Sequence, residues 1–111
     1  MADQHGLRGL PASPGRATGR VRIIRGPEDF ERLQPGEVLV APATAPAWTP
    51  LFGRCAAVVT DTGSVLAHAS LVAREFGIPA VVGTGDATAR LRDGQIVTVD
   101  GSAGIVEVPT G

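Results

Sequence analysis

Residues 55–83 read CAAVVTDTGSVLAHASLVAREFGIPAVVG, and this stretch decides the fold. The apolar run at 55–60 predicts a buried strand, and a glycine-containing loop follows it. A helix is predicted over residues 67–76, because Gly77 is a typical C-cap residue and Pro79 prevents the helix from continuing. The apolar residues directly after Pro79 predict another short buried strand. This alternation of strands with a helix indicates an α/β domain.

The sequence on either side predicts further strands and a few short helices around this unit. Strands are predicted at residues 17–24, 37–41, 95–100 and 104–108. The last two strands are expected to form a hairpin. Other elements are expected to be turns at residues 9–15, a short helix at 27–33, a loop with one short helical turn at 42–53 and a loop with a helical turn at 84–91. Three prolines in the third of these segments exclude a long regular element there.

The composition fits one folded domain. The chain has 111 residues, of which 43% are hydrophobic and 19% are charged, and this balance argues against general disorder. We expect a flexible lead-in at residues 1–6, the domain at 7–108 and a short tail at 109–111. The formal net charge is −1 and the arginines are spread from Arg8 to Arg92, so no nucleic-acid partner is expected.

The chain shows no sequence signal for a membrane, for secretion or for a metal. No run approaches the about 18 consecutive apolar residues of a membrane span, and residues 1–6 lack the features of a secretory signal. Cys55 is the single cysteine, which favours a reducing, cytoplasmic location. His5, Cys55 and His68 do not have the spacing of a metal site. We therefore expect this domain to bind no metal and no cofactor by itself.

His68 is the residue with the clearest chemical potential. It is predicted near a helix N-terminus, where backbone N–H groups and the helix dipole favour anions. Imidazole is largely uncharged near neutral pH and can act as a nucleophile. The hydroxyls of Thr60, Thr62 and Ser64 could donate hydrogen bonds to phosphoryl oxygens, and Gly63 would allow the backbone to come close. Together these features predict a group that accepts and passes on a phosphoryl group.

The same residues also fit a purely structural role. Leu71 and Val72 follow His68 by three and four residues, so the ring of a helical His68 would lie over an apolar face. Glycine and threonine before a helix are ordinary turn and cap residues. Trp48 fits ordinary packing or an interface, and Cys55 fits a small core position.

The central motif and both ends of the chain are similar to one known family. Residues 60–64 and 68–83 resemble its signature, residues 9–19 resemble its usual start, and residues 93–101 with Gly104 resemble its usual close. This family is the PEP-utilising enzyme mobile domain. It is the phosphohistidine domain of phosphoenolpyruvate synthase, pyruvate phosphate dikinase, rifampin phosphotransferase and enzyme I of the sugar phosphotransferase system.

The resemblance implies a swivelling β/β/α fold and a phosphorylated histidine at His68. In the family, this domain moves between an ATP-grasp domain, which binds ATP and Mg²⁺, and a second site for a substrate such as pyruvate, PEP or an antibiotic. Neither partner domain fits within 111 residues. The partner domains are therefore expected elsewhere in a longer protein or in separate chains.

The sequence departs from the family pattern just before the histidine. Ser64 stands where a second glycine is common, and Leu66 and Ala67 stand where a threonine and then a small hydroxyl residue or cysteine are common. A hydroxyl directly before the histidine could bind phosphoryl oxygens or hold the ring. Its absence motivates a second hypothesis, a non-catalytic binding or regulatory module that keeps the fold without phosphotransfer. A third hypothesis is an interaction domain that uses Trp48 and the proline-rich segment.

Overall fold

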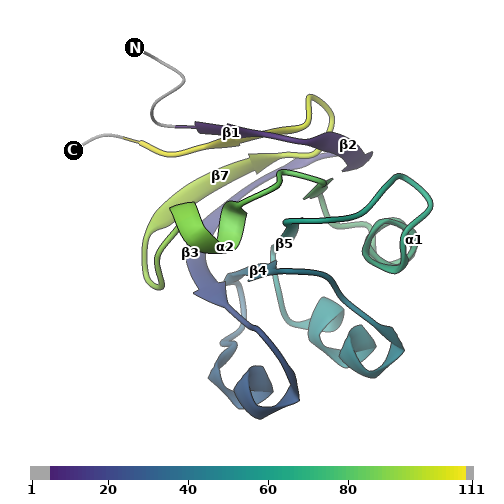
Figure 1. Cartoon of the computed structure of the whole chain (residues 1–111), viewed down its shortest axis with the longest axis vertical. Helices are drawn as coiled ribbons and strands as arrows, with labels where there is room; N and C mark the ends of the chain where they lie inside the picture. The colour runs from purple at the N-terminus through teal and green to yellow at the C-terminus, as the bar shows by residue number, and fades with distance from the viewer. Residues whose placement is uncertain (1–5, 110–111) are drawn as a thin grey trace.

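Eight short strands carry the fold in the computed structural model, which describes residues 6–109 (Figure 1). The strands are β1 (Gly6–Arg8), β2 (Leu10–Ser13), β3 (Arg16–Ile23), β4 (Val38–Ala41), β5 (Ala57–Thr60), β6 (Ala80–Val82), β7 (Ile96–Asp100) and β8 (Ile105–Glu107). The helices of the described residues are α1 (His68–Phe76), α2 (Ala87–Arg90) and the 3-10 helices η2 (Pro27–Arg32) and η3 (Pro46–Gly53). Strand β1 begins at the last residue of the predicted lead-in, whose other residues lie outside the described part.

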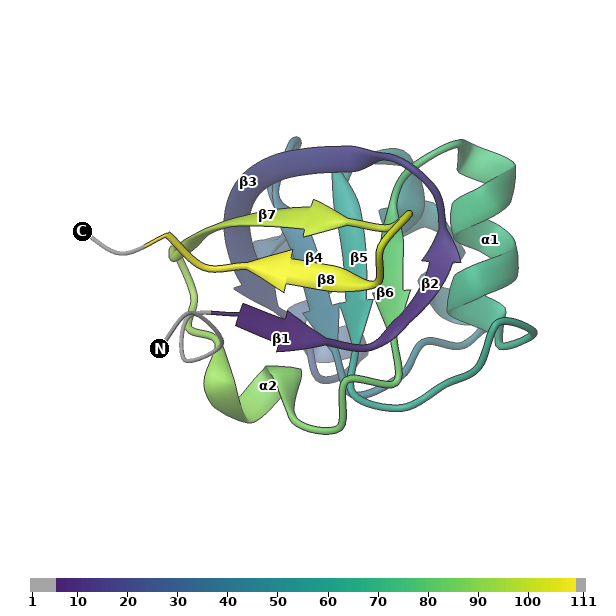
Figure 2. The ribbon, with the colours of Figure 1, turned by 90° about the horizontal axis from the view of Figure 1, so that it is seen from above.

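The N-terminal segment bridges the two ends of the sheet. The strand order is β1-β8-β7-β3-β4-β5-β6-β2, so the first two strands lie at opposite ends of the order. Only Gly9 separates β1 from β2, and the chain passes directly from one end to the other (Figure 2). Glycine is required at this crossing, because a Cβ on Gly9 would lie 2.5 Å from the carbonyl oxygen of Val82. The eight strands and the helices between them confirm the predicted α/β fold class.

Strand β2 corrects the prediction for residues 9–15, where only turns were expected. It pairs antiparallel with β6, and Pro11 lies opposite Val81. Proline is tolerated because β2 is the last strand of the order, where one side of the strand needs no N–H donor. The register shifts between Pro11 and Ser13. Glycine and proline predicted turns here because local residue preferences do not reveal a pairing partner far along the chain.

The centre of the sheet brings two loops side by side. The inner strands β3, β4, β5 and β6 run parallel, and the C-terminal pair β7 and β8 forms the predicted antiparallel hairpin. In the pairing of β4 with β5, Ala41 lies opposite Thr60. The loops that leave these two strands therefore start next to each other at the carboxyl edge of the sheet, which is where ligands commonly bind in parallel α/β sheets.

The helices agree with the predictions except in the proline-rich segment. Helix α1 ends at Phe76, and Gly77 caps it in the left-handed conformation, with a φ of 71°. Helix η3 covers eight residues, which is longer than the single helical turn that was expected. It buries Trp48, Leu51 and Phe52, and this packing outweighs the poor helix propensity of proline. Pro46 occupies its first turn, where a missing N–H is not needed.

A partly buried ion pair links β3 to the residue before β4. The Nε and Nη2 groups of Arg22 donate to the two carboxylate oxygens of Glu37, at 3.1 and 2.9 Å, and the Gln34 N–H also donates to Glu37 at 2.8 Å. The hydrogen bond from Arg22, followed by the Gln34 N–H, lowers the pKa of Glu37 below its usual value, against the opposing effect of burial. The carboxylate therefore contributes stability above the unfolded-state pKa, and this contribution is lost as the pH falls through the lowered folded-state pKa.

Replacing Glu37 by glutamine should lower the free energy of unfolding by about 2 kcal/mol at pH 7, because a charged hydrogen-bond acceptor is lost. The difference from wild type should shrink as the pH falls through the lowered folded-state pKa of Glu37, because the carboxylate then becomes protonated as well. Urea unfolding at pH 7 and at acid pH measures both values, with the exposed Glu31→Gln as the control. A difference that stays constant with pH would contradict this account.

Candidate functional site

His68 is the first residue of α1, and hydroxyl groups lie close to both of its ring nitrogens. Thr44 Oγ1 lies 2.7 Å from Nδ1, and Thr49 Oγ1 lies 3.3 Å from Nε2. The ring of Phe52 packs edge-on against the imidazole, with 5.9 Å between the ring centroids and an angle of 86°. The imidazole is half-buried. It is therefore a side chain held by its neighbours and still partly accessible to solvent.

The sequence analysis missed both threonines. Thr44 and Thr49 precede His68 by 24 and 19 residues. Thr44 lies in the loop that follows β4, Thr49 lies in η3, and His68 follows the loop after β5. They could have been found from the sequence by pairing the strand before Thr44 with the strand before the His68 loop, because paired parallel strands send their following loops to the same edge. The structure thus supplies from another segment a ring-holding hydroxyl that Ala67 cannot provide.

Two of the predicted phosphoryl-binding residues use their hydroxyls on backbone carbonyl groups, one in the His68 loop and one in the loop after β4. Thr60 is fully buried, and its hydroxyl donates to the Thr62 carbonyl oxygen at 2.6 Å. The Thr62 hydroxyl donates to the Pro42 carbonyl oxygen at 3.1 Å. Both threonines therefore brace the loop that leads to His68 in this structure.

The other two predicted residues lie at the exposed part of the same loop. Gly63 has a φ of 130°, which residues with a Cβ rarely adopt. The Ser64 hydroxyl accepts the Leu66 N–H at 3.2 Å and keeps its own proton for another acceptor. The Ser64 carbonyl accepts the hydroxyl of the fully buried Ser70 at 2.6 Å. The loop is thereby fastened to helix α1, and the role of Gly63 and Ser64 toward a phosphoryl group stays a prediction.

Asp61 anchors the loop from its other side and does not orient the imidazole. Its carboxylate accepts the Thr88 N–H at 2.9 Å and the Thr88 hydroxyl at 2.6 Å. The N–H and hydroxyl of Thr84 both donate to the Thr60 carbonyl oxygen, at 3.1 and 3.0 Å. The segment after β6 therefore holds the start of the His68 loop in place.

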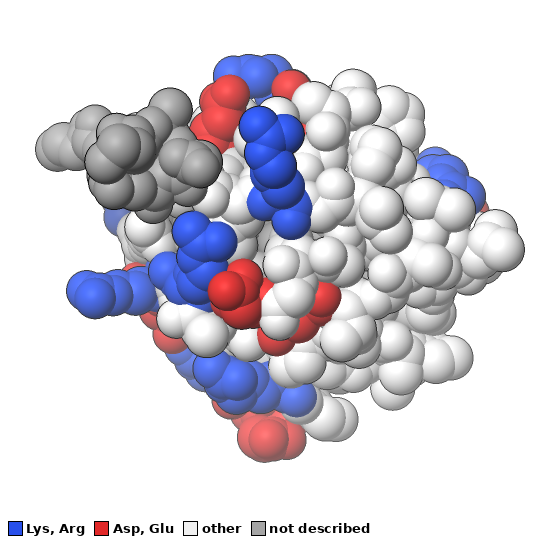
Figure 3. All heavy atoms as spheres, turned by 45° about the horizontal axis from the view of Figure 1, so that its top comes forward, with Lys and Arg blue, Asp and Glu red and all other residues white. Residues whose placement is uncertain are grey.

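The N-terminus of α1 offers uncapped backbone donors. Ala67 is the N-cap residue, no side chain forms a capping hydrogen bond, and the first turn contains no acidic residue. Free N–H groups at this position favour an anion. Figure 3 shows the charged side chains gathered over one half of the face in view, while the half over α1 is mostly uncharged.

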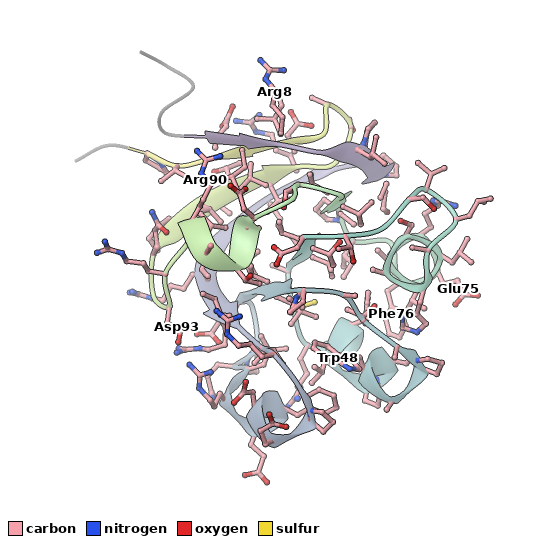
Figure 4. The ribbon with its side chains drawn as sticks, viewed as in Figure 1. Arg8, Trp48, Glu75, Phe76, Arg90 and Asp93 are labelled. Atoms are coloured by element: carbon pink, nitrogen blue, oxygen red, sulfur yellow. The ribbon has the colours of Figure 1, made fainter. Side chains whose placement is uncertain are left out.

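Trp48 and Cys55 are core residues and not functional candidates. Trp48 is 7% exposed, and its ring contacts Phe30 edge-on with 5.1 Å between centroids. It lies between η3 and η2, as Figure 4 shows. The interaction hypothesis for Trp48 is therefore wrong, and the packing interpretation is confirmed. Cys55 is buried, and burial raises the pKa of its thiol to about 12.

Residues 6–109 contain neither a metal-type cluster of side chains nor a membrane-spanning helix. Within this range, no three His, Cys, Asp or Glu side chains are grouped so that they could hold a metal ion. None of the helices in this part of the chain has the length and apolar character needed to cross a membrane.

Comparison with known proteins identifies relatives of this chain. Residues 33–104 match the family described as PEP-utilising enzyme, mobile domain. The chain is 56% identical over 100 residues to the uncharacterized phosphotransferase YvkC of Bacillus subtilis, an alignment that covers 90% of this chain and 12% of the relative. It is 54% identical over 101 residues to a phosphoenolpyruvate synthase of Aeropyrum pernix, again covering 90% of this chain and 12% of the relative.

A solved structure gives the same result. The solution structure of Enzyme I (nEIt) has a TM-score of 0.64 to this chain at 33% identity, and the match covers 75% of this chain and 34% of that chain. This chain spans 12% of the length of each of the two curated relatives. The family match, the sequence identities and the shared fold all agree, and the chain belongs to the PEP-utilising enzyme mobile domain family.

Proposed function

We propose that this chain is a phosphoryl-carrier domain and that His68 accepts and passes on the phosphoryl group. The observation that carries this proposal is the position of the imidazole at the uncapped N-terminus of α1, with Nδ1 held by Thr44 at 2.7 Å. A held imidazole next to free backbone donors can attack phosphorus while the phosphoryl oxygens are bound. Relatives named as phosphotransferase and phosphoenolpyruvate synthase support the same reaction class.

Nε2 is the nucleophilic atom in this proposal. The Nδ1 proton donates to Thr44 Oγ1, which leaves the lone pair on Nε2 free for attack. The Nε2–P bond forms as the bond between phosphorus and the leaving oxygen breaks, and the leaving oxygen takes both electrons. Thr49 Oγ1, 3.3 Å from Nε2, turns away from the nitrogen and donates to a phosphoryl oxygen instead.

The loop before His68 binds the transferred group. Gly63 and Ser64 lie in its exposed part, and the free Ser64 hydroxyl proton and the first N–H groups of α1 are the donors for phosphoryl oxygens. Thr60 and Thr62 act on the phosphoryl group indirectly, because their hydroxyls hold the shape of the loop. Ring positioning and oxygen binding are thus divided between two segments.

The donor and the acceptor of the phosphoryl group lie on other domains. We propose an ATP-grasp domain that binds ATP and Mg²⁺ as the donor and a substrate domain for a compound such as pyruvate, PEP or an antibiotic as the acceptor, in the same or another chain. The fraction of the curated relatives outside the matching segment leaves room for such domains. The cytoplasmic location stays a prediction.

Transfer of label to the chain tests this function. The chain is incubated with ATP labelled in the β- and γ-phosphoryl groups and with the Bacillus subtilis relative from which the matching 100 residues have been removed. We expect label that is lost in acid and kept in base, as phosphohistidine requires, and that maps to His68 by mass spectrometry. Label on another residue, or no label, would contradict the carrier role and favour a non-catalytic binding module.

Replacing Thr44 by valine should slow ATP-dependent labelling at least about tenfold, in line with other groups that orient a reactive imidazole. Without this hydroxyl the ring can turn, or can place its proton on Nε2 toward Thr49, and either change removes the nucleophile. Thr44→Ser should restore most of the rate because it restores the hydroxyl. Thr18→Val is the control, since it removes an equally short 2.7 Å hydroxyl contact with Thr98 on the sheet. Equal labelling of the Thr44→Val variant and wild type would contradict the role of Thr44 in holding the imidazole.

A further inference from the structure

Arg74 lies in the last turn of α1, and its guanidinium donates to two backbone carbonyl groups outside the helix. Nε donates to the Ala12 carbonyl oxygen of β2 at 2.7 Å, and Nη2 donates to the Val65 carbonyl oxygen in the His68 loop, residues 61–67. None of the ion pairs among residues 6–109 includes this side chain. Arg74 therefore joins β2, α1 and the loop that precedes α1.

The His68 loop depends on such hydrogen bonds for its shape. None of its residues is buried, so apolar packing does not fix it. Ser70 lies one helical turn before Arg74, and its hydroxyl donates to the Ser64 carbonyl oxygen at 2.6 Å. Ser70 and Arg74 thus hold the consecutive carbonyl groups of Ser64 and Val65 from one face of α1.

The peptide group between Val65 and Leu66 connects Arg74 to the hydroxyl of Ser64. This peptide is trans, so its C=O and N–H groups point in opposite directions. The C=O group accepts the hydrogen bond from Arg74, and the N–H group donates to Ser64 Oγ at 3.2 Å. If Arg74 released the carbonyl, the peptide plane could turn and carry the N–H group away from Oγ. The guanidinium and the serine hydroxyl are therefore linked through one rigid backbone unit.

This link restricts where the Ser64 hydroxyl proton points. Ser64 is exposed, and a serine hydroxyl without partners rotates among three staggered positions. While Oγ accepts the Leu66 N–H, the hydroxyl proton must point away from that group. A donor stabilises the charge that develops on phosphoryl oxygens only if it is aimed at them before the reaction. The orientation of the Val65–Leu66 peptide thus affects phosphoryl binding directly.

We propose that Arg74 is a positioning residue of the phosphoryl site and that it aims the Ser64 hydroxyl through the Val65–Leu66 peptide. This inference rests on the proposed carrier function and adds to it a residue that does not touch the phosphoryl group. Nε and Nη2 of Arg74 both donate to backbone carbonyl oxygens. No bond to phosphorus forms or breaks at Arg74, and its contribution is the orientation of the loop.

A double-variant cycle tests this link. Arg74→Met, Ser64→Ala and the double variant are compared with wild type, because methionine keeps a long side chain and a high helix propensity but has no N–H donor. The readouts are kcat and KM for labelling by ATP and the shortened Bacillus subtilis relative. Arg90→Met is the control, since Arg90 is also exposed and donates to a backbone carbonyl oxygen outside the loop, that of Gly6, at 3.3 Å.

The expected result is a lower kcat with an unchanged KM, because the aimed hydroxyl acts in the transition state. We expect kcat to fall at least about tenfold for Ser64→Ala and at least about fivefold for Arg74→Met. Arg90→Met should match wild type. Adding Arg74→Met to Ser64→Ala should lower kcat by less than about a further twofold, because the hydroxyl that Arg74 aims is already absent.

The outcomes separate the positioning role from the carrier function. A wild-type kcat for Arg74→Met would overturn the positioning role. An equal fall in kcat with and without the Ser64 hydroxyl would overturn it as well, because Arg74 would then act independently of Ser64. In both results wild-type His68 is still labelled, so the carrier function stands. If wild-type His68 takes up no label, the carrier function fails and the positioning role fails with it.

Hydrogen exchange of the Leu66 amide tests the same link without phosphoryl transfer. This amide belongs to an exposed residue and is protected while it donates to Ser64 Oγ. Its exchange should accelerate at least about threefold in Ser64→Ala and in Arg74→Met and should stay at the wild-type rate in Arg90→Met. Unchanged exchange in either of the first two variants would show that the guanidinium and the hydroxyl are not linked through this peptide and would overturn the proposal.

Discussion

The His68→Ala variant is expected to take up no ATP-derived label at all, while it still folds, with a free energy of unfolding within about 1 kcal/mol of wild type. Nε2 is the atom that bonds to phosphorus in the proposed reaction, and alanine offers no nucleophile in its place. The side chain is half-buried at a helix terminus, and alanine has a high helix propensity. Labelling with ATP and the shortened relative, together with urea unfolding, measures both quantities.

His5→Ala is the matched control for this prediction. His5 is the only other histidine of the chain, and it belongs to the predicted lead-in. We expect this variant to be labelled at the wild-type rate. Acid-labile label that persists in His68→Ala, or that disappears in His5→Ala, would show that another residue carries the phosphoryl group and would end the assignment to His68.

The Gly101→Ala variant is expected to lose more than about 4 kcal/mol of its free energy of unfolding, or not to fold, since overpacking against backbone is among the most damaging core changes. A Cβ at this position would lie 1.8 Å from the Ser13 carbonyl oxygen and 2.9 Å from the Ala80 nitrogen. Both are backbone atoms, of β2 and β6, and cannot turn away as the end of a side chain can. The N–H of Gly101 also donates to the Gly15 carbonyl oxygen at 2.8 Å.

Gly53→Ala serves as the control for this clash. A Cβ on Gly53 would lie 3.5 Å from the ring of Phe76, which is ordinary van der Waals contact. The variant should therefore unfold within about 1 kcal/mol of wild type. Urea unfolding followed by circular dichroism compares the two variants. A stable Gly101→Ala protein would mean that β2, β6 and the β7–β8 turn do not meet as tightly as described.

Local sequence patterns were enough for most of the secondary structure. Apolar runs predicted the central strands, and Gly77 with Pro79 predicted the end of α1, because helix capping and the apolar pattern of a central strand are written in consecutive residues. The predictions were incomplete where distant contacts decide the structure. Strand β2 forms because β6 offers it a partner, and η3 lengthens because Trp48 and its neighbours are buried.

The candidate site, too, could be predicted from the sequence only in part. The motif around His68 pointed to phosphoryl chemistry and to the family, because nucleophile, loop glycine and helix start are consecutive in the chain. The partners of the ring could not be read from that motif. Thr44 and Thr49 reach the imidazole because β4 and β5 lie side by side in parallel, so that two loops separated in sequence leave the same edge of the sheet.

The sequence by itself therefore determined the fold class, the family and the helix that begins at the candidate histidine, since each depends on residues within one short stretch. Only the tertiary structure decided that Thr60 and Thr62 use their hydroxyls to brace the loop and that Thr44 holds Nδ1. It also showed Trp48 buried and Leu66 exposed. The physical reason is that hydrogen-bond partners and exposure depend on which segments pack together, and strand pairing sets that across distances that local patterns do not report.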